Sequence, residues 1–397
     1  MRVGIIVSSI DETSGGAHTI TSNLLSALQN WNRHNSQIEI FLILSQVRQR
    51  RDKVDPSKEF HIIYSPNKVL RRILRIKWLF SNLLLYVFFR RKFDFRASRS
   101  ASLNRLISKN NLHVVWSTEP LSFALEVPYI NTVWDVAHRT SPYFPEVSNR
   151  FQWHIRELNN TEAIQRAYLN VVGTEVGASE LIRAYGIDRE RILVNPFPVP
   201  NVESLGDFPE RVLGTFFYPA QFWPHKNHAT LIRAMKILKG KTELDVQLTL
   251  TGADKGNLEF IKTLISELNL GDCVSLEGFV SKNRVNELYQ TCGLFVFPTL
   301  IGPDNLPPLE AIAYGAPLLI SRFPGSVEQI GAAAKYFDPL NPQELADLML
   351  LSIENPQEWK ENQEKAAAIR DTRRYDNYLS KVLERLELLT EVRSVWP

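Results

Sequence analysis

Cysteine is scarce in this sequence, with two residues, Cys273 and Cys292, among 397. A disulfide framework is therefore not expected, and a reducing compartment fits this composition. Long hydrophobic runs are also missing, because the longest, WLFSNLLLYVFF over residues 78–89, is too short to span a bilayer. The opening MRVGIIVSSI is typical of a buried strand rather than a signal peptide.

Two short motifs of enzyme chemistry are also lacking. The sequence has no Asp-x-Asp pair, so we expect neither a divalent metal clamp nor a metal site. A glycine-rich turn, SGGAH, follows the first apolar run, and Gly15 and Gly16 permit close backbone approach there. It lacks the G-x-G-x-x-G spacing of a dinucleotide fingerprint, and no cofactor is expected.

The remaining composition is that of a globular protein, with 44% hydrophobic and 22% charged residues. A chain of 397 residues is too long for one ordinary core and suggests two domains. The net charge of +3 is unevenly spread: residues 68–99 hold ten Lys or Arg against one acid, so that segment is +9 and the rest is −6. Such a segment indicates an anionic surface as a partner.

Short apolar runs alternate with helical patterns along the whole chain. This alternation predicts an α/β fold with parallel, doubly wound sheets. A proline-rich segment over 196–209 interrupts it as a linker, after which the pattern restarts. We therefore predict domains over 1–200 and 210–375, and a helix over 376–397 that could pack on either domain, including back on the N-terminal one. Ligands should bind at the carboxyl ends of the strands, between the domains.

The segment GPDNLPPLEA, residues 302–311, carries the strongest local signal. An apolar strand ends near Thr299, and the proline pair predicts a helix that begins at about Pro307. Free amides of Asn305 and Leu306 would then form an anion site at the helix N-terminus. Glu310, in the first turn, could accept hydrogen bonds from a ribose diol. The alternative is that Glu310 only balances the helix dipole.

The segment YPAQFWPHKNH, residues 218–228, carries a second signal. It predicts a strand, a loop with Lys226, and a helix from about residue 227 or 228. Lys226 would lie at the same sheet edge as the 305–310 segment and could bind a phosphate there. Alternatively, it is one of the many loop lysines that only contact solvent.

These segments, in this order, resemble the family 4 (group 1) glycosyltransferases of the GT-B fold over nearly the full length of the chain. The resemblance is strongest in YPAQFWPHKNHATLIRA, in VSLEGFVSKNRVNELYQTCGLFVFPTLIGPDNLPPLEAIAYGAPLLIS and in GSVEQIGAAAKYFDP. It implies two Rossmann-like domains that face a central cleft. The N-terminal domain would bind the acceptor and the C-terminal domain the nucleotide sugar.

The resemblance also implies roles for individual residues. The second glutamate of the family's E-x₇-E pattern falls on Glu310 as the ribose ligand, and the phosphate-binding lysine falls on Lys226. The family's glycine-rich loop falls on Gly15 and Gly16. The segment WDVAHR would place His138, together with Asp135, near the transferred hexose, although a single histidine is more often structural.

Two positions depart from the family pattern. The first glutamate of E-x₇-E is replaced by Gly302, so that Asp304 or Asn305 is expected to hold the sugar hydroxyls instead. The arginine that often precedes the lysine by five residues is Gln221. Lys226 and the helix N-terminus, with the Asn305 and Leu306 amides, would then neutralise the diphosphate.

Together these features predict a retaining, metal-independent hexosyltransferase. It would use a nucleoside-diphosphate sugar, UDP-glucose by family frequency, and a glycan or lipid-linked acceptor in polysaccharide biosynthesis. A nucleotide-sugar epimerase or a phosphorylase of the same fold is the alternative. A non-catalytic binder of nucleotides or nucleic acid would leave Lys226 and Glu310 without a role, and no nucleic-acid partner is expected.

The basic segment also bears on location. Apolar residues recur at helical spacing over 73–87, opposite a face with Lys68, Arg71, Arg72 and Arg75. A basic amphipathic helix is typical of a membrane-surface element, so we predict a cytoplasmic protein, peripheral at the inner face of the membrane. An ordinary buried helix with a solvated basic face is the alternative.

Overall fold

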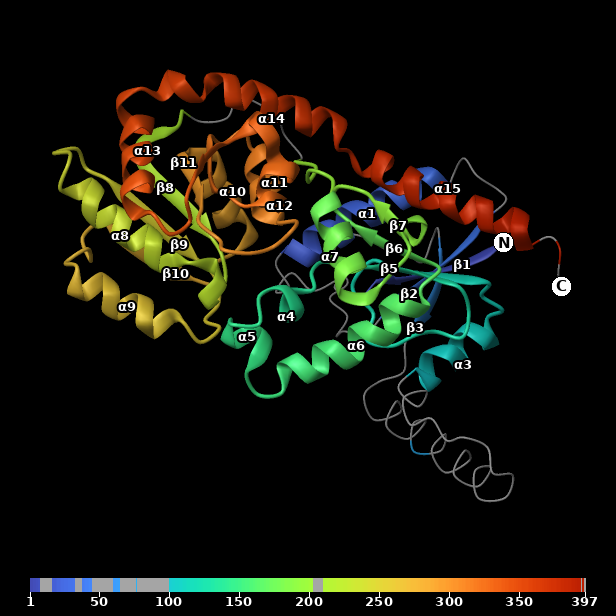
Figure 1. Cartoon of the computed structure of the whole chain (residues 1–397). Coiled ribbons are helices and arrows are strands. Elements are labelled where there is room, and N and C mark those ends of the chain that lie inside the picture. The colour runs from blue at the N-terminus through green and yellow to red at the C-terminus, as the bar shows by residue number, and fades with distance from the viewer. Residues whose placement is uncertain are drawn as a thin grey trace.

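The structure is a computed structural model. It describes residues 1–7, 16–32, 38–44, 60–64, 76, 100–202, 210–393 and 395. Apart from Ile76, the basic segment 68–99 lies outside the described residues, as do Gly15 and residues 203–209 of the predicted linker. The described residues form two domains, each built on one parallel sheet (Figure 1).

The first sheet has seven described strands in the order β3-β2-β1-β4-β5-β6-β7. Their bounds are β1 (Arg2–Val7), β2 (Glu39–Leu44), β3 (His61–Tyr64), β4 (Val114–Ser117), β5 (Tyr129–Thr132), β6 (Leu169–Val172) and β7 (Ile192–Val194). Neighbouring strands pair in parallel, and β4, β5 and β6 are buried along their whole length. Such burial, with helices on both faces, explains why most residues of these strands are apolar.

The helices of the first domain lie between these strands. They are α1 (Gly16–Asn32), α3 (Ala101–Lys109), α4 (Ala137–Thr140), α5 (Pro145–Ser148), α6 (Gln152–Arg166) and α7 (Glu175–Tyr185). Helix α7 begins at a true N-cap, because the hydroxyl oxygen of Thr174 accepts the amide of Gly177 at 3.0 Å. It ends at Gly186, whose positive φ of 64° closes the last turn.

The second sheet has six strands in the order β10-β9-β8-β11-β12-β13, again paired in parallel. The strands are β8 (Val212–Pro219), β9 (Gln247–Thr251), β10 (Val274–Gly278), β11 (Cys292–Phe297), β12 (Leu318–Ser321) and β13 (Lys335–Phe337). The surrounding helices are α8 (His228–Lys239), α9 (Leu258–Glu267), α10 (Lys282–Thr291), α11 (Leu306–Ala313), α12 (Pro324–Ile330), α13 (Pro342–Glu354) and α14 (Lys360–Thr372).

The final described helix, α15 (Tyr375–Arg393), returns to the first domain and packs against α1 (Figure 1). Many of its apolar side chains are buried, among them Tyr378, Leu379 and Leu383. The side-chain amide of Asn195, just after β7, donates to the Tyr378 carbonyl at 2.9 Å. The first domain is therefore completed by a helix that follows the second domain in sequence.

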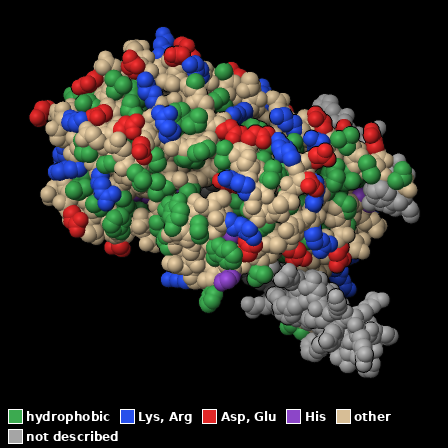
Figure 2. All heavy atoms as spheres, viewed as in Figure 1, with side chains coloured by type: hydrophobic (Ala, Val, Ile, Leu, Met, Phe, Trp, Pro, Cys, Tyr) green, Lys and Arg blue, Asp and Glu red, His purple; other side chains and the backbone are tan. Residues whose placement is uncertain are grey.

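The doubly wound α/β fold predicted from the sequence is confirmed by these two sheets. Basic and acidic side chains are interspersed over the visible face of both domains (Figure 2). Among the described helices, none is both long enough and apolar enough to cross a bilayer. Cys273 and Cys292 are both buried free thiols.

Candidate functional site

The carboxyl ends of β8 and β11 bring two predicted site residues together. These strands are neighbours in the second sheet, so the loops that follow them share one edge. The loop after β8 ends in a 3₁₀ turn over Pro224–Lys226, directly before α8. The loop after β11 leads to Asn305, the N-cap of α11. Lys226 Nζ donates to Asn305 Oδ1 at 3.3 Å.

Lys226 is held in a poorly hydrated position. Its ammonium lies 5.2 Å from the centre of the Phe297 ring, a cation–π contact. Burial lowers the pKa of Lys226 to about 8, although the carboxylates of Asp135 and Glu146 in the first domain act in the opposite direction. The side chain is therefore mostly charged at neutral pH, but it has little charge compensation in the described residues beyond these two acids.

The N-terminus of α11 differs from the sequence prediction in two respects. The helix begins at Leu306 rather than Pro307. The amide of Asn305 is not free, because it donates to Gln329 Oε1 at 3.1 Å, and Gln329 Nε2 donates back to the Asn305 carbonyl at 2.8 Å. Because Pro307 and Pro308 carry no N–H, an anion at this helix would meet the Leu306 amide and the Lys226 ammonium, rather than the Asn305 amide.

Glu310 lies in the second turn of α11, not in the first turn as predicted, because the helix starts at Leu306. Its Oε2 accepts a hydrogen bond from the Tyr289 hydroxyl at 2.8 Å. Burial raises the pKa of Glu310, while the Tyr289 hydrogen bond lowers it. One oxygen of the Glu310 side chain is thus held in place by Tyr289.

Asp304 faces the first domain. Its Oδ1 accepts a hydrogen bond from Gln329 Nε2, and its Oδ2 lies so close to Gly173 that an added Cβ there would be 1.5 Å away. Burial raises the pKa of Asp304 to about 7, against the charge of Arg373. Asp304 therefore sits in the contact between domains, which does not favour its predicted role as a sugar ligand.

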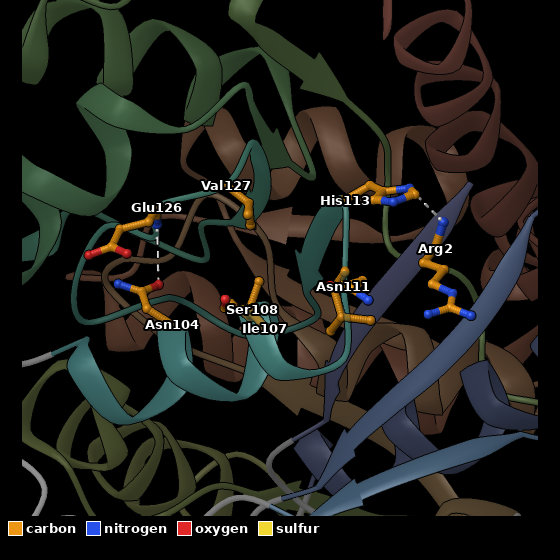
Figure 3. Close-up of a pocket in the computed structure, with 9 residues that line it drawn as sticks. Arg2, Asn104, Ile107, Ser108, Asn111, His113, Glu126 and Val127 are labelled. Atoms are coloured by element: carbon orange, nitrogen blue, oxygen red, sulfur yellow. Dashed lines mark hydrogen bonds between the residues drawn. The ribbon is translucent and has the colours of Figure 1, made fainter. Parts of the chain in front are cut away.

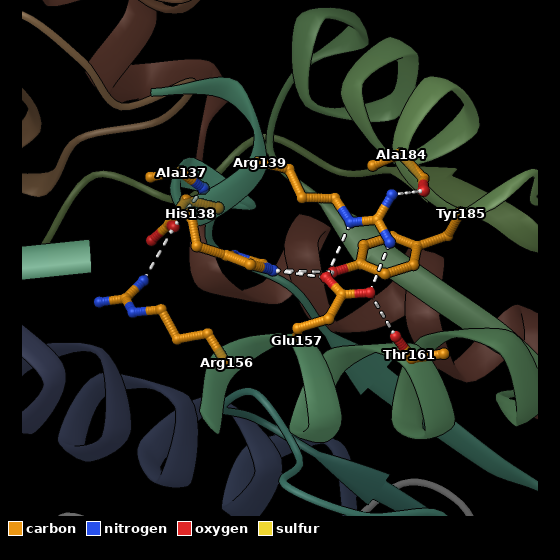
Figure 4. Close-up of polar contacts among 9 residues, drawn as sticks. Ala137, His138, Arg139, Arg156, Glu157, Thr161, Ala184 and Tyr185 are labelled. Atoms are coloured by element: carbon orange, nitrogen blue, oxygen red, sulfur yellow. Dashed lines mark hydrogen bonds and ion pairs between the residues drawn. The ribbon is translucent and has the colours of Figure 1, made fainter. Parts of the chain in front are cut away.

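His138 belongs to a polar cluster within the first domain (Figure 4). Its Nε2 lies 3.2 Å from Glu157 Oε2 and 3.0 Å from the Tyr185 hydroxyl. Arg139 forms an ion pair with the same Glu157 and lies over the Tyr185 ring. His138 is fully buried, and burial lowers its pKa despite the Glu157 hydrogen bond.

The two nitrogens of His138 therefore differ. Nε2 is used by Glu157 and Tyr185, while Nδ1 is buried and finds no partner in the described part of the chain. Asp135, three residues earlier, accepts the Ala137 amide at 2.9 Å and lies 3.3 Å from Arg156 Nη1. Of the predicted glycine pair, Gly16 is the first residue of α1, and Gly15 lies outside the described residues.

Sequence analysis missed the contacts that join the two domains. Glu146 of α5 accepts two hydrogen bonds from His225, the residue before Lys226. Both carboxylate oxygens of Glu328 in α12 accept backbone amides at the start of α7, from Glu175 and Val176. The Thr174 hydroxyl donates to the Pro303 carbonyl at 3.2 Å.

These contacts surround the predicted site on the side of the first domain. Between Asp135, Glu180 and Pro303, the domains enclose a space of only about 10 Å³, so they are in direct contact there. In the sequence, the Pro145–Glu146 pair is a local indication of a helix start at this place, since proline is favoured at the first position of a helix.

A larger pocket lies elsewhere, at the amino ends of β1, β4 and β5 (Figure 3). It measures about 720 Å³ and is lined by Arg2, Asn104, His113 and Glu126, among others. The Arg2 amide donates to His113 Nδ1 at 3.1 Å, and the Glu126 amide donates to Asn104 Oδ1 at 3.2 Å. In parallel sheets ligands bind at the opposite, carboxyl edge, so this pocket is not the candidate site.

Metal ligands do not cluster at the site. Within the described ranges, no group of three or more His, Cys, Asp or Glu side chains has the arrangement of a metal centre. The groups that do converge are one ammonium, one helix N-terminus and several carboxylates. This set suits a ligand that carries both a phosphate and hydroxyl groups.

Comparison with known proteins assigns the second domain to a family. Residues 213–370 match the family model "Glycosyl transferases group 1". Lys226, Asn305 and Glu310 all fall within the matched range. The family resemblance predicted from the sequence is confirmed.

Similar proteins of known activity include two from Escherichia coli. The chain is 26% identical over 249 residues to the serotype-specific mannosyltransferase WbdA, covering 57% of this chain and 30% of that protein. It is 23% identical over 243 residues to an O-antigen chain mannosyltransferase B, covering 58% of this chain and 62% of that protein. The chain thus spans less than two thirds of the length of these relatives.

Solved structures match the chain over nearly its whole length. A sucrose-phosphate synthase from Thermosynechococcus elongatus has a TM-score of 0.68 at 15% identity, covering 98% of this chain and 100% of that one. The Anabaena protein HepE, solved in complex with UDP and glucose, has a TM-score of 0.65 at 15% identity, covering 98% and 99%. These matches confirm the GT-B fold predicted for the chain.

Proposed function

We propose, from the match of residues 213–370 to the group 1 glycosyltransferases and from the GT-B fold of the chain, that the protein is a retaining, metal-independent glycosyltransferase. It moves a hexose from a nucleoside-diphosphate sugar to a glycan or lipid-linked acceptor in polysaccharide biosynthesis, with UDP-glucose as the favoured donor. The observation that carries this proposal is the Lys226 ammonium, which lies against Asn305 at the N-terminus of α11.

The proposed chemistry rests on stabilisation of the leaving group. When the bond between the sugar and the β-phosphate breaks, negative charge grows on a phosphate oxygen. Lys226 is placed in a poorly hydrated site, where an ammonium interacts more strongly with such a charge than it would in water. The Leu306 amide and the positive end of the α11 helix dipole add to this stabilisation, since Pro307 and Pro308 have no N–H to donate. No metal is required in this scheme.

The remaining predicted residues receive complementary roles in the proposal. Glu310 binds the ribose hydroxyls through the carboxylate oxygen that Tyr289 does not use. His138 faces the hexose through Nδ1, the ring nitrogen that Glu157 and Tyr185 leave available. The glycine pair Gly15 and Gly16 lets the chain approach the donor closely at the start of α1.

The relatives support the hexose and the nucleotide in this proposal. Two curated relatives are named mannosyltransferases, and HepE was solved with UDP and glucose. UDP-glucose is therefore the first donor to test, and a nucleoside-diphosphate mannose is the second.

The proposal is tested by ligand binding and then by turnover. UDP, GDP and ADP should be compared by thermal shift, since a ligand at about 100 times its Kd stabilises a protein by about 2.7 kcal/mol. UDP release from UDP-glucose should then depend on an added panel of glycans and lipid-linked sugars, and it should persist in EDTA. An epimerase would need no acceptor, and a phosphorylase would need phosphate. If no nucleoside diphosphate raises Tm, the proposal is wrong.

The membrane association predicted for the basic segment 68–99 is also part of the proposal, although that segment lies outside the described residues apart from Ile76. Each basic side chain near an anionic surface contributes about 1 kcal/mol, screened by salt. The protein should sediment with anionic vesicles at low salt and be released at high salt. Replacing Arg71, Arg72 and Arg75 by Gln should weaken this binding without changing UDP affinity. Failure of wild type to bind anionic vesicles at low salt would refute the association.

A further inference from the structure

Glu146 is a carboxylate of the first domain that reaches the phosphate-binding turn of the second. It lies in the first turn of α5, after Pro145. Its side chain is only 5% exposed, and its partner His225 is 17% exposed. His225 directly precedes Lys226 in the 3₁₀ turn Pro224–Lys226. Glu146 is therefore buried in the contact between the domains, beside the proposed donor site.

One oxygen of Glu146 is fully used by the protein. Oε1 accepts the backbone amide of His225 at 3.1 Å and lies 2.5 Å from its ring Nδ1. Burial raises the pKa of Glu146, but the hydrogen bonds from His225 outweigh it, so that the pKa lies below its ordinary value. Glu146 is therefore ionised at neutral pH, and its orientation is set by His225.

The other oxygen of Glu146 lacks a protein donor. Within the described part of the chain, Oε2 is buried and no hydrogen-bond donor reaches it. An ionised oxygen in this condition is costly unless a ligand supplies a donor. The charge of Glu146 acts to raise the pKa of Lys226, but the Lys226 ammonium donates its hydrogen bond to Asn305 rather than to Glu146. Glu146 Oε2 thus retains its capacity to accept a hydrogen bond, on a side chain near enough to Lys226 for the two charges to interact.

Glu146 lies near the loop that contains Gly302, the position where the family pattern has a glutamate. The Leu300 amide donates to the His225 carbonyl at 2.9 Å, and Leu300 and Ile301 pack against Phe144 and Val147 on either side of Glu146. Gly302 itself has a φ of 121°, and a Cβ there would lie 2.7 Å from the Asn305 side-chain amide. Its conformation therefore disfavours any side chain, including a carboxylate.

We propose that Glu146 is a sugar-binding residue. Its Oε2 accepts a hydrogen bond from a hydroxyl of the donor hexose, and it replaces the acid that is missing at residue 302. This inference rests on the proposed function, because it requires a nucleoside-diphosphate sugar at Lys226. The hexose is bonded to the phosphate that Lys226 binds, so its hydroxyls fall within reach of groups around that lysine. A hydroxyl donating to a carboxylate gives a short, charge-assisted hydrogen bond.

The competing role of Glu146 is purely structural, as a clasp that joins the domains through His225. Glu146→Gln separates the two roles. The glutamine oxygen can still accept from His225, whereas its amide nitrogen donates and cannot accept a sugar hydroxyl. Glu328→Gln is the matched control, because Glu328 also joins the domains but contacts the start of α7 instead.

The test measures kcat/KM with UDP-glucose and with analogues that each lack one hydroxyl, together with the Kd of UDP. Wild type and Glu328→Gln should lose about 10- to 100-fold toward one analogue, the cost of one hydrogen bond to a charged group. Glu146→Gln should lose activity toward UDP-glucose by a similar factor and no longer discriminate against that analogue. Its UDP affinity should remain within about twofold of wild type, which also shows that it is folded.

Two results overturn the inference separately from the proposed function. If wild type turns over UDP-glucose and Glu146→Gln keeps the wild-type pattern of discrimination, Glu146 does not bind the sugar. The same holds if Glu146→Gln loses activity equally toward all analogues, since that is the pattern of a clasp. If wild type neither binds UDP nor turns over UDP-glucose, the proposed function fails and the inference fails with it.

Discussion

His138 lies just after β5 in the first domain and Lys226 just after β8 in the second, and their surroundings differ. Both follow the carboxyl end of a strand, and burial lowers the pKa of both. His138 Nε2 has two partners in its own domain, and the cluster is completed by the ion pair of Arg139 with Glu157. Within the described part of the chain, the Lys226 ammonium has one hydrogen bond, to Asn305 at 3.3 Å, and one cation–π contact, with Phe297.

The difference indicates what each residue can do. A side chain tied into its own network is held rigidly and presents one fixed atom, in this case Nδ1 of His138. A poorly hydrated cation with few partners is electrostatically unfavourable, and an anionic ligand that binds beside it stabilises its charge. From this comparison we expect Lys226 to stabilise developing negative charge and His138 to help position the hexose.

The largest effect should come from Lys226→Ala. Removing the ammonium should lower kcat/KM by about 10²- to 10³-fold, the scale of losing one preorganised group at a developing charge. UMP affinity should hardly change, because UMP lacks the β-phosphate. Lys236→Ala, which removes an exposed lysine on α8, is the control and should be silent. Equal losses for UMP and UDP would place Lys226 away from the β-phosphate.

The pH profile should show the next largest effect. Burial lowers the pKa of Lys226 to about 8, and only the protonated form binds phosphate well. In wild type, kcat/KM should therefore fall about tenfold per pH unit above pH 8, since this parameter reports the free enzyme. Lys226→Arg does not titrate in this range, so its residual activity should stay level. A level wild-type profile up to pH 9.5 would contradict the assignment.

Glu310→Ala tests the same domain without touching the ammonium. It removes charge-assisted hydrogen bonds to the ribose, worth about 1.5–3 kcal/mol each, so the Kd of UDP should rise at least about tenfold. The measurement is calorimetric titration of UDP, with thermal unfolding to confirm that the variant is folded. Tyr289→Phe, which removes only the hydroxyl that orients Glu310, should have a smaller effect. Unchanged UDP affinity would remove the ribose assignment.

The smallest functional effect should come from His138→Ala. Loss of one neutral hydrogen bond to the hexose should lower kcat by about 2- to 10-fold, while leaving UDP affinity unchanged. The variant should also lose stability, because Glu157 and Tyr185 lose a buried partner. Glu157→Gln disturbs the same cluster but leaves Nδ1 in place. If both variants lose kcat equally, His138 acts only through the structure.

The sequence was sufficient to predict the two parallel sheets. Apolar strands that alternate with helices leave few other ways to bury both faces, and both sheets are parallel as predicted. It also placed Lys226 and Asn305 at one sheet edge, where their side chains meet. Both inferences depend on the order of elements, which a sequence records directly.

The details of the site depend on contacts between distant segments, which local patterns do not record. The free amide expected at Asn305 is used by Gln329, 24 residues later in the chain. Asp304 turns toward Gly173 of the other domain, and Glu146 reaches across to His225. A residue's preference for a helix start or a loop says nothing about these partners, because they are fixed by the way the two domains dock.

Helix α15 has a consequence for how the protein is made. It covers α1 of the first domain, with Tyr378 and Leu383 buried, but the ribosome synthesises it only after the entire second sheet. Domains commonly fold in turn as they emerge during synthesis. Here the apolar surface over α1 stays uncovered in the nascent chain until α15 has been synthesised. Completion of the first domain is therefore coupled to synthesis of the second. During that interval the uncovered surface is a natural target for chaperones.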